Sequence, residues 1–84
     1  MRVTVLVTES VLEIDGVRYH HHPNGGGLVA DGAQVDPSAS VDLQCIVQGR
    51  ATIGARARLT GRITVSAGAR VNEGETYDGE LIIR

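Results

Sequence analysis

The side chains best suited to binding a ligand are arginines in the middle of the chain. Residues 50 to 70 contain five arginines and no acid, whereas residues 31 to 42 carry three aspartates and residues 73 to 80 carry four acids. A guanidinium group can bind a phosphate or carboxylate through two parallel hydrogen bonds. The candidate ligand-binding residues are Arg50, Arg56, Arg58 and Arg62. The alternative is that these arginines only pair with neighbouring acids, and such pairs contribute little at a protein surface.

Three consecutive histidines, His20 to His22, are candidate metal ligands, because imidazole is the commonest protein ligand for zinc and related metals. On a strand, successive side chains point to opposite faces, so one chain offers at most two of these ligands on one face. No cysteine or carboxylate lies at a supporting spacing. We therefore predict no metal site, and imidazoles from three chains around a threefold axis are the alternative.

No grouping of a nucleophile with an acid and a base is evident. Cys45 is the single cysteine, and it falls on an inward position of the repeat described below, where a thiol is ordinarily inert. We therefore expect no catalytic residues, no cofactor and no enzymatic activity.

The length and composition predict a thin core. A compact monomer of 84 residues buries only about 60% to 65% of the surface that its unfolded chain exposes. The chain has no Phe or Trp, and a single cysteine excludes an intrachain disulfide. We expect stability to come from association with copies of the same chain.

The charge and hydropathy exclude two classes of partner. A formal net charge of −2 argues against general binding of nucleic acids. No stretch is apolar enough for a membrane span, and the N-terminus lacks the apolar core of a signal peptide. We expect a cytoplasmic protein that does not bind membranes.

Apolar residues recur every six positions over more than half of the chain. The first series is Val29, Val35, Val41, Val47, Ile53, Leu59, Val65 and Val71. The second series, four residues later, is Ala33, Ala39, Cys45, Ala51, Ala57, Ile63 and Ala69, and Glu75 interrupts it. A period of six fits neither an α-helix nor a simple amphipathic strand. It fits short strands separated by corners, because Gly, Pro and polar residues fill the positions between.

The runs that begin at Val35, Ile53 and Val65 resemble the hexapeptide repeat of left-handed parallel β-helix proteins, and the resemblance covers residues 29 to 76. It implies an all-β fold, a short left-handed parallel β-helix of about three coils, with three hexads in each triangular coil and trimers formed side by side. Acyltransferases and carbonic anhydrases of this family use histidines within or beside their coils. Here every histidine precedes the repeat, which puts both activities in doubt.

Three hexads per coil predict which residues stack on one another. The predicted columns are Val29, Val47 and Val65; Val35, Ile53 and Val71; Val41, Leu59 and Tyr77; and Cys45, Ile63 and Leu81. The last column makes residues 77 to 82 a ninth, degenerate hexad. The outward neighbours Ile46, Thr64 and Ile82 form an apolar stripe, which we predict to be a subunit interface. The alternative is that the N-terminal strands fold back and cover this stripe.

Residues 1 to 27 are predicted to form an N-terminal β-hairpin element, and residues 28 to 84 the β-helix. Residues 3 to 7 alternate like a strand, and Asp15-Gly16 is a strong hairpin signal. Such an element caps the open edge of a solenoid. The segment from Pro23 to Gly27 is predicted to be a turn into the repeat, with an anion-binding nest of backbone N–H groups as the alternative.

A small β-element, a glycine-rich step and uninterrupted hexads also resemble short proteins of phages and prophages. This implies a structural, regulatory or anti-defence role. The predicted function is a non-catalytic homotrimer that binds or sequesters an anionic small ligand, such as a nucleotide, at subunit interfaces. The alternative is a structural or inhibitory module that contacts a host protein.

Overall fold

The structure is a computed structural model, and it describes residues 6–8, 11–14 and 16–84. These ranges contain strands and turns but no helix, and therefore no helix able to cross a membrane. The strands are β1 (Leu6–Thr8), β2 (Val11–Ile14), β3 (Val17–His21), β4 (Leu28–Ala30), β5 (Gln34–Val35), β6 (Ser40–Val41), β7 (Ile46–Val47), β8 (Thr52–Ile53), β9 (Arg58–Val65), β10 (Arg70–Val71) and β11 (Thr76–Ile83).

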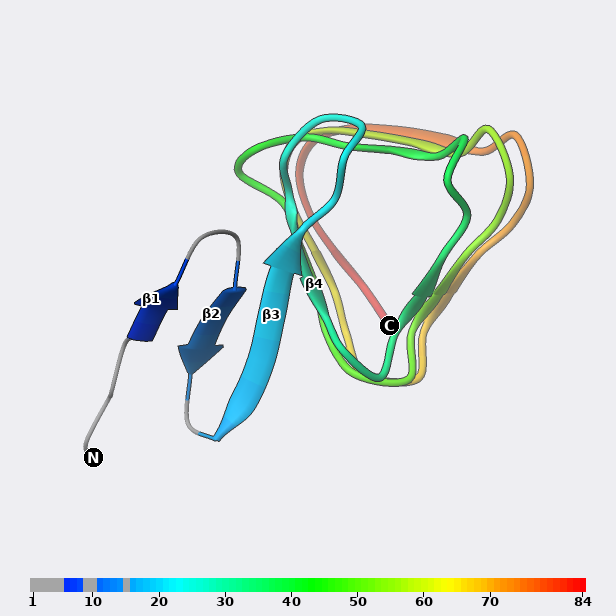
Figure 1. Cartoon of the computed structure of the whole chain (residues 1–84). Helices are drawn as coiled ribbons and strands as arrows, with labels where there is room; N and C mark the ends of the chain where they lie inside the picture. The colour runs from blue at the N-terminus through cyan, green and yellow to red at the C-terminus, as the bar shows by residue number, and fades with distance from the viewer. Residues whose placement is uncertain (1–5, 9–10, 15) are drawn as a thin grey trace.

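From β4 onward the chain winds into a three-sided tube of about three coils (Figure 1). Side A consists of β4, β7 and the C-terminal halves of β9 and β11. Side B consists of β5, β8 and β10, and side C of β6 with the N-terminal halves of β9 and β11. Viewed along the axis with the N-terminal coil nearest, the chain turns counter-clockwise as it recedes, so the tube is left-handed (Figure 1). The predicted all-β, parallel β-helix is confirmed.

Strand pairing between coils is parallel and confirms the predicted stacking. Partners lie 18 residues apart, as with Val29 and Val47, which are directly paired. The same register pairs Val35 with Ile53 and Leu59 with Tyr77. Because each coil contains three hexads, residues 18 positions apart stack on the same side of the tube.

The two apolar series fill the interior. Every member is buried except Val35 and Ala33, which are partly exposed in the first coil. Burial of a Val, Leu or Ile side chain stabilises the fold by about 1.5–3 kcal/mol. Where Glu75 interrupts the second series, its carboxylate accepts a hydrogen bond of 2.7 Å from the Asn72 N–H and closes that turn instead.

The N-terminal strands extend side A beyond the first coil. Strand β3 pairs antiparallel with β4, and β2 and β1 continue the same sheet outward (Figure 1). Of the predicted hairpin, Asp15 and residues 3–5 lie outside the described residues. The pairing of β3 with β4 places these strands next to the edge of side A, and the alternative that they cover the stripe stays a prediction.

The segment that follows β3 closes the first coil on side C. The N–H of Val41 donates to the Asn24 carbonyl oxygen, and the N–H of Gly27 donates to the Val41 carbonyl oxygen, at 3.0 and 2.9 Å. His22 is only 4% exposed, and its Nε2–H donates to the Ala39 carbonyl oxygen at 2.8 Å. The turn predicted at Pro23 to Gly27 is therefore also docked onto the coil below it.

Candidate functional site

Side A carries a continuous apolar column on its outer surface. Strand register places Ile46 directly over Thr64 and Thr64 over Ile82. Leu28 precedes them in the same column, as the partner of Ile46. Ile82 is 62% exposed, while Leu28, Ile46 and Thr64 are half-buried. The structure therefore brings the three predicted interface residues together and adds Leu28; we call the four residues the side A stripe.

Two further leucines border the stripe. Leu43 lies at the corner between sides C and A and is 68% exposed. Leu81 points inward in the last coil, where the tube interior is less covered, and is 40% exposed. Leu43 was not predicted, because a corner residue has no fixed place in the inward and outward alternation of the strands. Exposed apolar residues that gather on one side of a protein are candidates for a contact surface.

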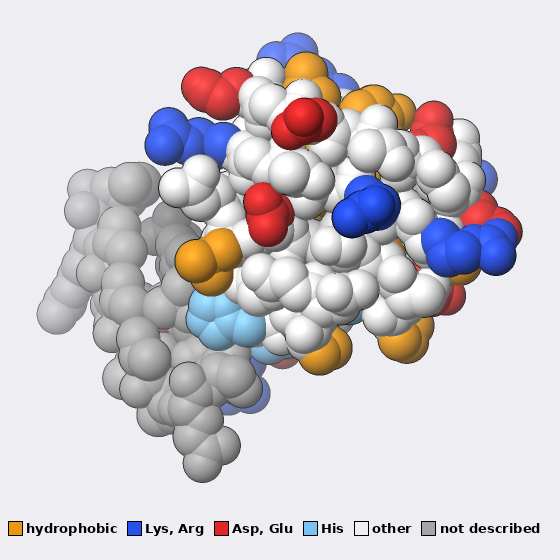
Figure 2. Space-filling view, turned by 90° about the horizontal axis from the view of Figure 1, so that it is seen from above, with side chains coloured by type: hydrophobic (Ala, Val, Ile, Leu, Met, Phe, Trp, Pro, Cys, Tyr) orange, Lys and Arg blue, Asp and Glu red, His pale blue; other side chains and the backbone are white. Residues whose placement is uncertain are grey.

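Side C has a different surface. Its outward residues are Ser40 and Asp42 on the first coil, Arg58 and Thr60 on the second, and Thr76 and Asp78 on the third. Figure 2 looks onto this side and shows mostly polar surface with single, separated charges. Side A is therefore better suited than side C to packing against another protein surface.

The four candidate arginines surround the tube rather than meeting at one place. Arg50 lies at the corner between sides A and B, and Arg56 at the corner between sides B and C. Arg58 points outward from side C, and Arg62 points outward from side A beside Thr64. All four are exposed. Within one chain they form no common pocket, but Arg50 and Arg62 flank the side A stripe at its two edges.

Arg50 and Arg56 both have backbones in the left-handed region, with φ of 65° and 60°. For a residue with a Cβ this conformation costs on the order of 1–2 kcal/mol. One coil further on, the same two corner positions hold Gly68 and Gly74, with φ of 79° and 75°. Glycine is thus the residue that these corners favour, and the two arginines occupy them at a cost in stability.

Arg56 is held by contacts with its neighbours. Its guanidinium group forms an ion pair with Glu73 of the next coil, and its backbone N–H donates to the Ser38 hydroxyl oxygen at 3.0 Å. The Asp36 carboxylate in turn accepts hydrogen bonds from the Ser38 hydroxyl and N–H, at 2.6 and 2.9 Å. Those two hydrogen bonds hold the pKa of Asp36 below its ordinary value, chiefly through the hydroxyl. This corner is therefore a structural network.

Arg50, Arg58 and Arg62 differ from Arg56 in having no ion pair with any described residue. The N–H of Arg50 donates to the Gly32 carbonyl oxygen at 3.3 Å, which is a contact of the backbone alone. Among the described residues, pairing with a neighbouring acid therefore accounts for only one of the four candidate arginines, Arg56.

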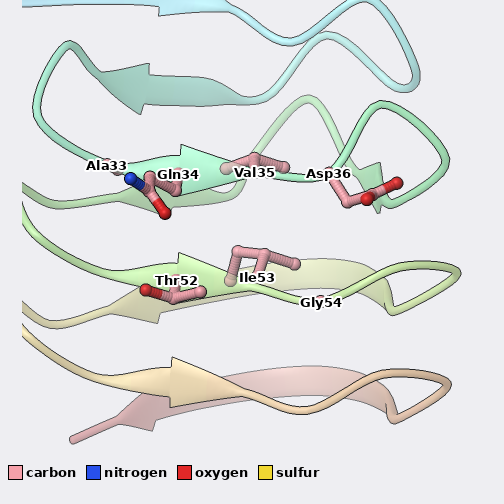
Figure 3. Close-up of a pocket in the computed structure, with 7 residues that line it drawn as sticks. All are labelled: Ala33, Gln34, Val35, Asp36, Thr52, Ile53 and Gly54. Atoms are coloured by element: carbon pink, nitrogen blue, oxygen red, sulfur yellow. The ribbon is translucent and has the colours of Figure 1, made fainter.

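Two hollows lie on the outer surface. One on side B lies along β5 and β8, with Gln34 above Thr52 and Val35 above Ile53, and no arginine lines it (Figure 3). The other, on side A, is lined by Arg62, Thr64, Glu80, Leu81 and Ile82. The side A hollow combines a guanidinium group with the exposed end of the stripe, and it is the stronger candidate for a ligand.

Each of the three histidines contacts another residue of the chain through a ring nitrogen. The Nδ1–H of His21 donates to the Gly26 carbonyl oxygen at 2.8 Å, and His22 is bound to Ala39. His20 Nδ1 lies 3.4 Å from an Asp31 carboxylate oxygen. No group of three or more His, Cys, Asp or Glu side chains in the described ranges is placed to hold a metal ion.

Cys45 lies in the interior, where its Sγ–H donates to the carbonyl oxygens of Leu59 and Gly61 at 3.6 and 3.4 Å. Burial raises the pKa of this thiol above its ordinary value. A raised pKa keeps the thiol protonated and unreactive at neutral pH. Its position is that of a core residue.

Comparison with protein-family models, with curated proteins and with solved structures finds no significant match. The fold and the surface of side A define the protein as a short parallel β-helix with an apolar column on one side.

Proposed function

We propose that the chain is a member of the hexapeptide-repeat class that assembles as a homotrimer through side A and binds an anionic small ligand between subunits. The observation that carries this proposal is the apolar stripe flanked by Arg50 and Arg62, neither of which has an ion pair among the described residues.

Assembly is favoured by the thin core and by the open stripe. Among the described residues, the buried core cluster consists of Val, Ile, Leu, Ala and one Cys, and Tyr77 packs against it partly buried. A chain of this size leaves a large share of its surface in contact with water. Packing of Ile46 and Ile82 against another copy removes apolar area from water, at about 25 cal/mol for each Å².

The two flanking arginines explain how one ligand site per interface arises. Arg50 and Arg62 lie at opposite edges of side A. In a closed ring of copies, one edge of each subunit meets the other edge of the next. Arg50 of one copy then lies beside Arg62 of its neighbour, and two guanidinium groups from different chains can bind one phosphate or carboxylate group.

The proposed activity is sequestration. It requires preorganised donors on a rigid scaffold and no reaction chemistry. A nucleotide is the ligand class that we favour, since its phosphates suit paired guanidinium groups. Binding of a nucleotide signal would give a phage protein an anti-defence role.

The test compares two variants of side A with one control variant of side C in one assay. Thermal unfolding of the full chain is measured with ATP, a cyclic dinucleotide and inorganic phosphate. We expect Arg50→Ala and Arg62→Ala to lose the ligand-induced rise in Tm, since each removes a charge-assisted hydrogen bond. Arg58→Ala on side C is the matched control and should retain the rise, with all variants still trimeric. No rise for the wild-type chain with any of these probes, or equal loss in all variants, contradicts the proposal.

The second candidate is a protein-binding module. It is favoured by Leu43, a large apolar side chain that is 68% exposed at the corner between sides C and A. In that case the purified chain stays monomeric and binds one stoichiometric partner from a host lysate. Leu43→Asp would then abolish the complex, whereas Arg50→Ala would not.

A further inference from the structure

The two ends of the tube differ in how their backbone edges are covered. At the N-terminal end, β3 pairs with β4, and the segment from Asn24 to Gly27 is hydrogen-bonded to Val41. At the other end, β11 pairs with β9 along one edge over all eight of its residues. No described residue pairs with the opposite edge of β11.

Backbone polarity identifies which groups lie on that edge. Between coils, the N–H of each outward residue donates to an inward residue of the next coil, as from Gln34 to Ala51 and from Arg58 to Glu75. In parallel strands alternate residues hydrogen-bond to opposite neighbours. The unpaired N–H and C=O groups of β11 therefore belong to its outward residues, Thr76, Asp78, Glu80 and Ile82.

Two of these four residues are acids. Asp78 and Glu80 are exposed on either side of Gly79, which forms the corner between sides C and A. Antiparallel pairing of two β11 strands with their Gly79 residues opposite each other places Asp78 opposite Glu80 of the second copy. Like charges in direct opposition destabilise a strand pair. The edge therefore disfavours a second copy and favours a cationic strand.

We propose that the free edge of β11 is a docking site for an extended segment of another protein with basic residues at two alternate positions. The charge complementarity of Asp78 and Glu80 selects the partner, and the open backbone groups bind it by strand addition. This proposal goes beyond the ligand site and is independent of assembly through side A.

The pairing of β9 with β11 shows what such a segment must resemble. In β9, Arg62 lies opposite Glu80, and Ile63 covers the inward Leu81. Gly61 lies over Gly79 at the corner, with φ of 99° and 100°. The partner segment therefore has a basic residue, a glycine and a second basic residue in that order, with an apolar residue before and after them. Its apolar side chains cover Leu81, which is 40% exposed.

The experiment is an NMR titration of the labelled full chain with the octapeptide Arg-Leu-Arg-Gly-Arg-Ile-Thr-Val, which is the β9 sequence with Thr60→Arg. We expect saturable shifts confined to residues 76–83. Asp78→Arg combined with Glu80→Arg should weaken binding at least about tenfold, because two attractive pairs become repulsive. Asp31→Arg, an exposed acid at the other end of the tube, makes half that charge change and should weaken binding less than twofold.

A second peptide separates strand addition from charge attraction. It carries the same side chains, but the alternate residues whose N–H groups would face β11 are N-methylated. It therefore cannot form the backbone hydrogen bonds with β11 and should not bind. Equal binding of both peptides, no saturable shift with the first peptide at millimolar concentration, or a similar loss for Asp31→Arg overturns the proposal. Self-pairing of the wild-type chain through β11 at neutral pH also overturns it.

Discussion

Gly61 lies directly over Gly79 at the corner between sides C and A, and both have φ near 100°. A Cβ added to Gly61 would lie 2.7 Å from the Gly79 carbonyl oxygen. The Gly61 N–H also donates to the Asp42 carboxylate of the coil above, at 3.2 Å. Close stacking of two glycines is why β9 and β11 continue around this corner as eight-residue strands, whereas the first coil turns there without a strand.

Replacement of Gly61 by Ala should destabilise the fold by about 2 kcal/mol or more, because the left-handed backbone and the close contact both oppose a Cβ. Gly49→Ala is the matched control, since a Cβ there meets no atom within 4 Å and no positive φ is involved. Urea unfolding monitored by circular dichroism measures both. Equal stability of the two variants would show that the glycine stack is unimportant.

Ala57 fills an inward position with no exposed surface. Ala57→Leu should cost about 1–3 kcal/mol, since extra methylene groups in a packed core force neighbouring side chains and backbone to move. Ala67→Leu adds the same atoms at an exposed corner and should change the free energy of unfolding by less than about 0.5 kcal/mol. Thermal unfolding measures the stability of both variants. Equal stability would show that the interior around Ala57 is not closely packed.

The period of six predicts the stacking of the inward columns correctly, because inward positions recur with the coil. It does not predict the surface equally well. Leu43 and Arg50 lie at corners, where no alternation says which way a side chain points. The two long strands are not predicted either, since Gly61 and Gly79 read as ordinary turn residues until their stacking is known. The docking of His22 depends on a contact with Ala39, 17 residues away.

Arg50→Gly should raise stability and weaken anion binding. Glycine relieves the left-handed backbone at φ 65°, so we expect Tm to rise by a few degrees, as a gain of about 1 kcal/mol does in a domain of this size. The same change removes one of the two proposed ligand contacts. Calorimetry gives Tm, and titration with ATP gives affinity. A fall in Tm would assign Arg50 a structural role instead.

The corner at Asp36 should make stability depend on pH. Its folded pKa lies below the ordinary value of 3.8, because Ser38 stabilises the carboxylate. This contribution is complete above the unfolded pKa and is lost as the pH falls through the folded pKa. Asp36→Asn should therefore be less stable than wild type at about pH 6, and the difference should shrink as the pH falls below about 4. A difference that is constant over this range would exclude the carboxylate as its source.

Assembly through side A is tested most directly by native mass spectrometry of the wild-type chain and of Ile46→Asp at the same concentration. We expect the wild-type chain at three times its 8.9 kDa mass, with any bound anionic ligand retained, and the variant as a monomer, because a charge replaces the centre of the stripe. A wild-type chain that is folded and monomeric at tens of micromolar would contradict the proposed trimer and the ligand site between its subunits.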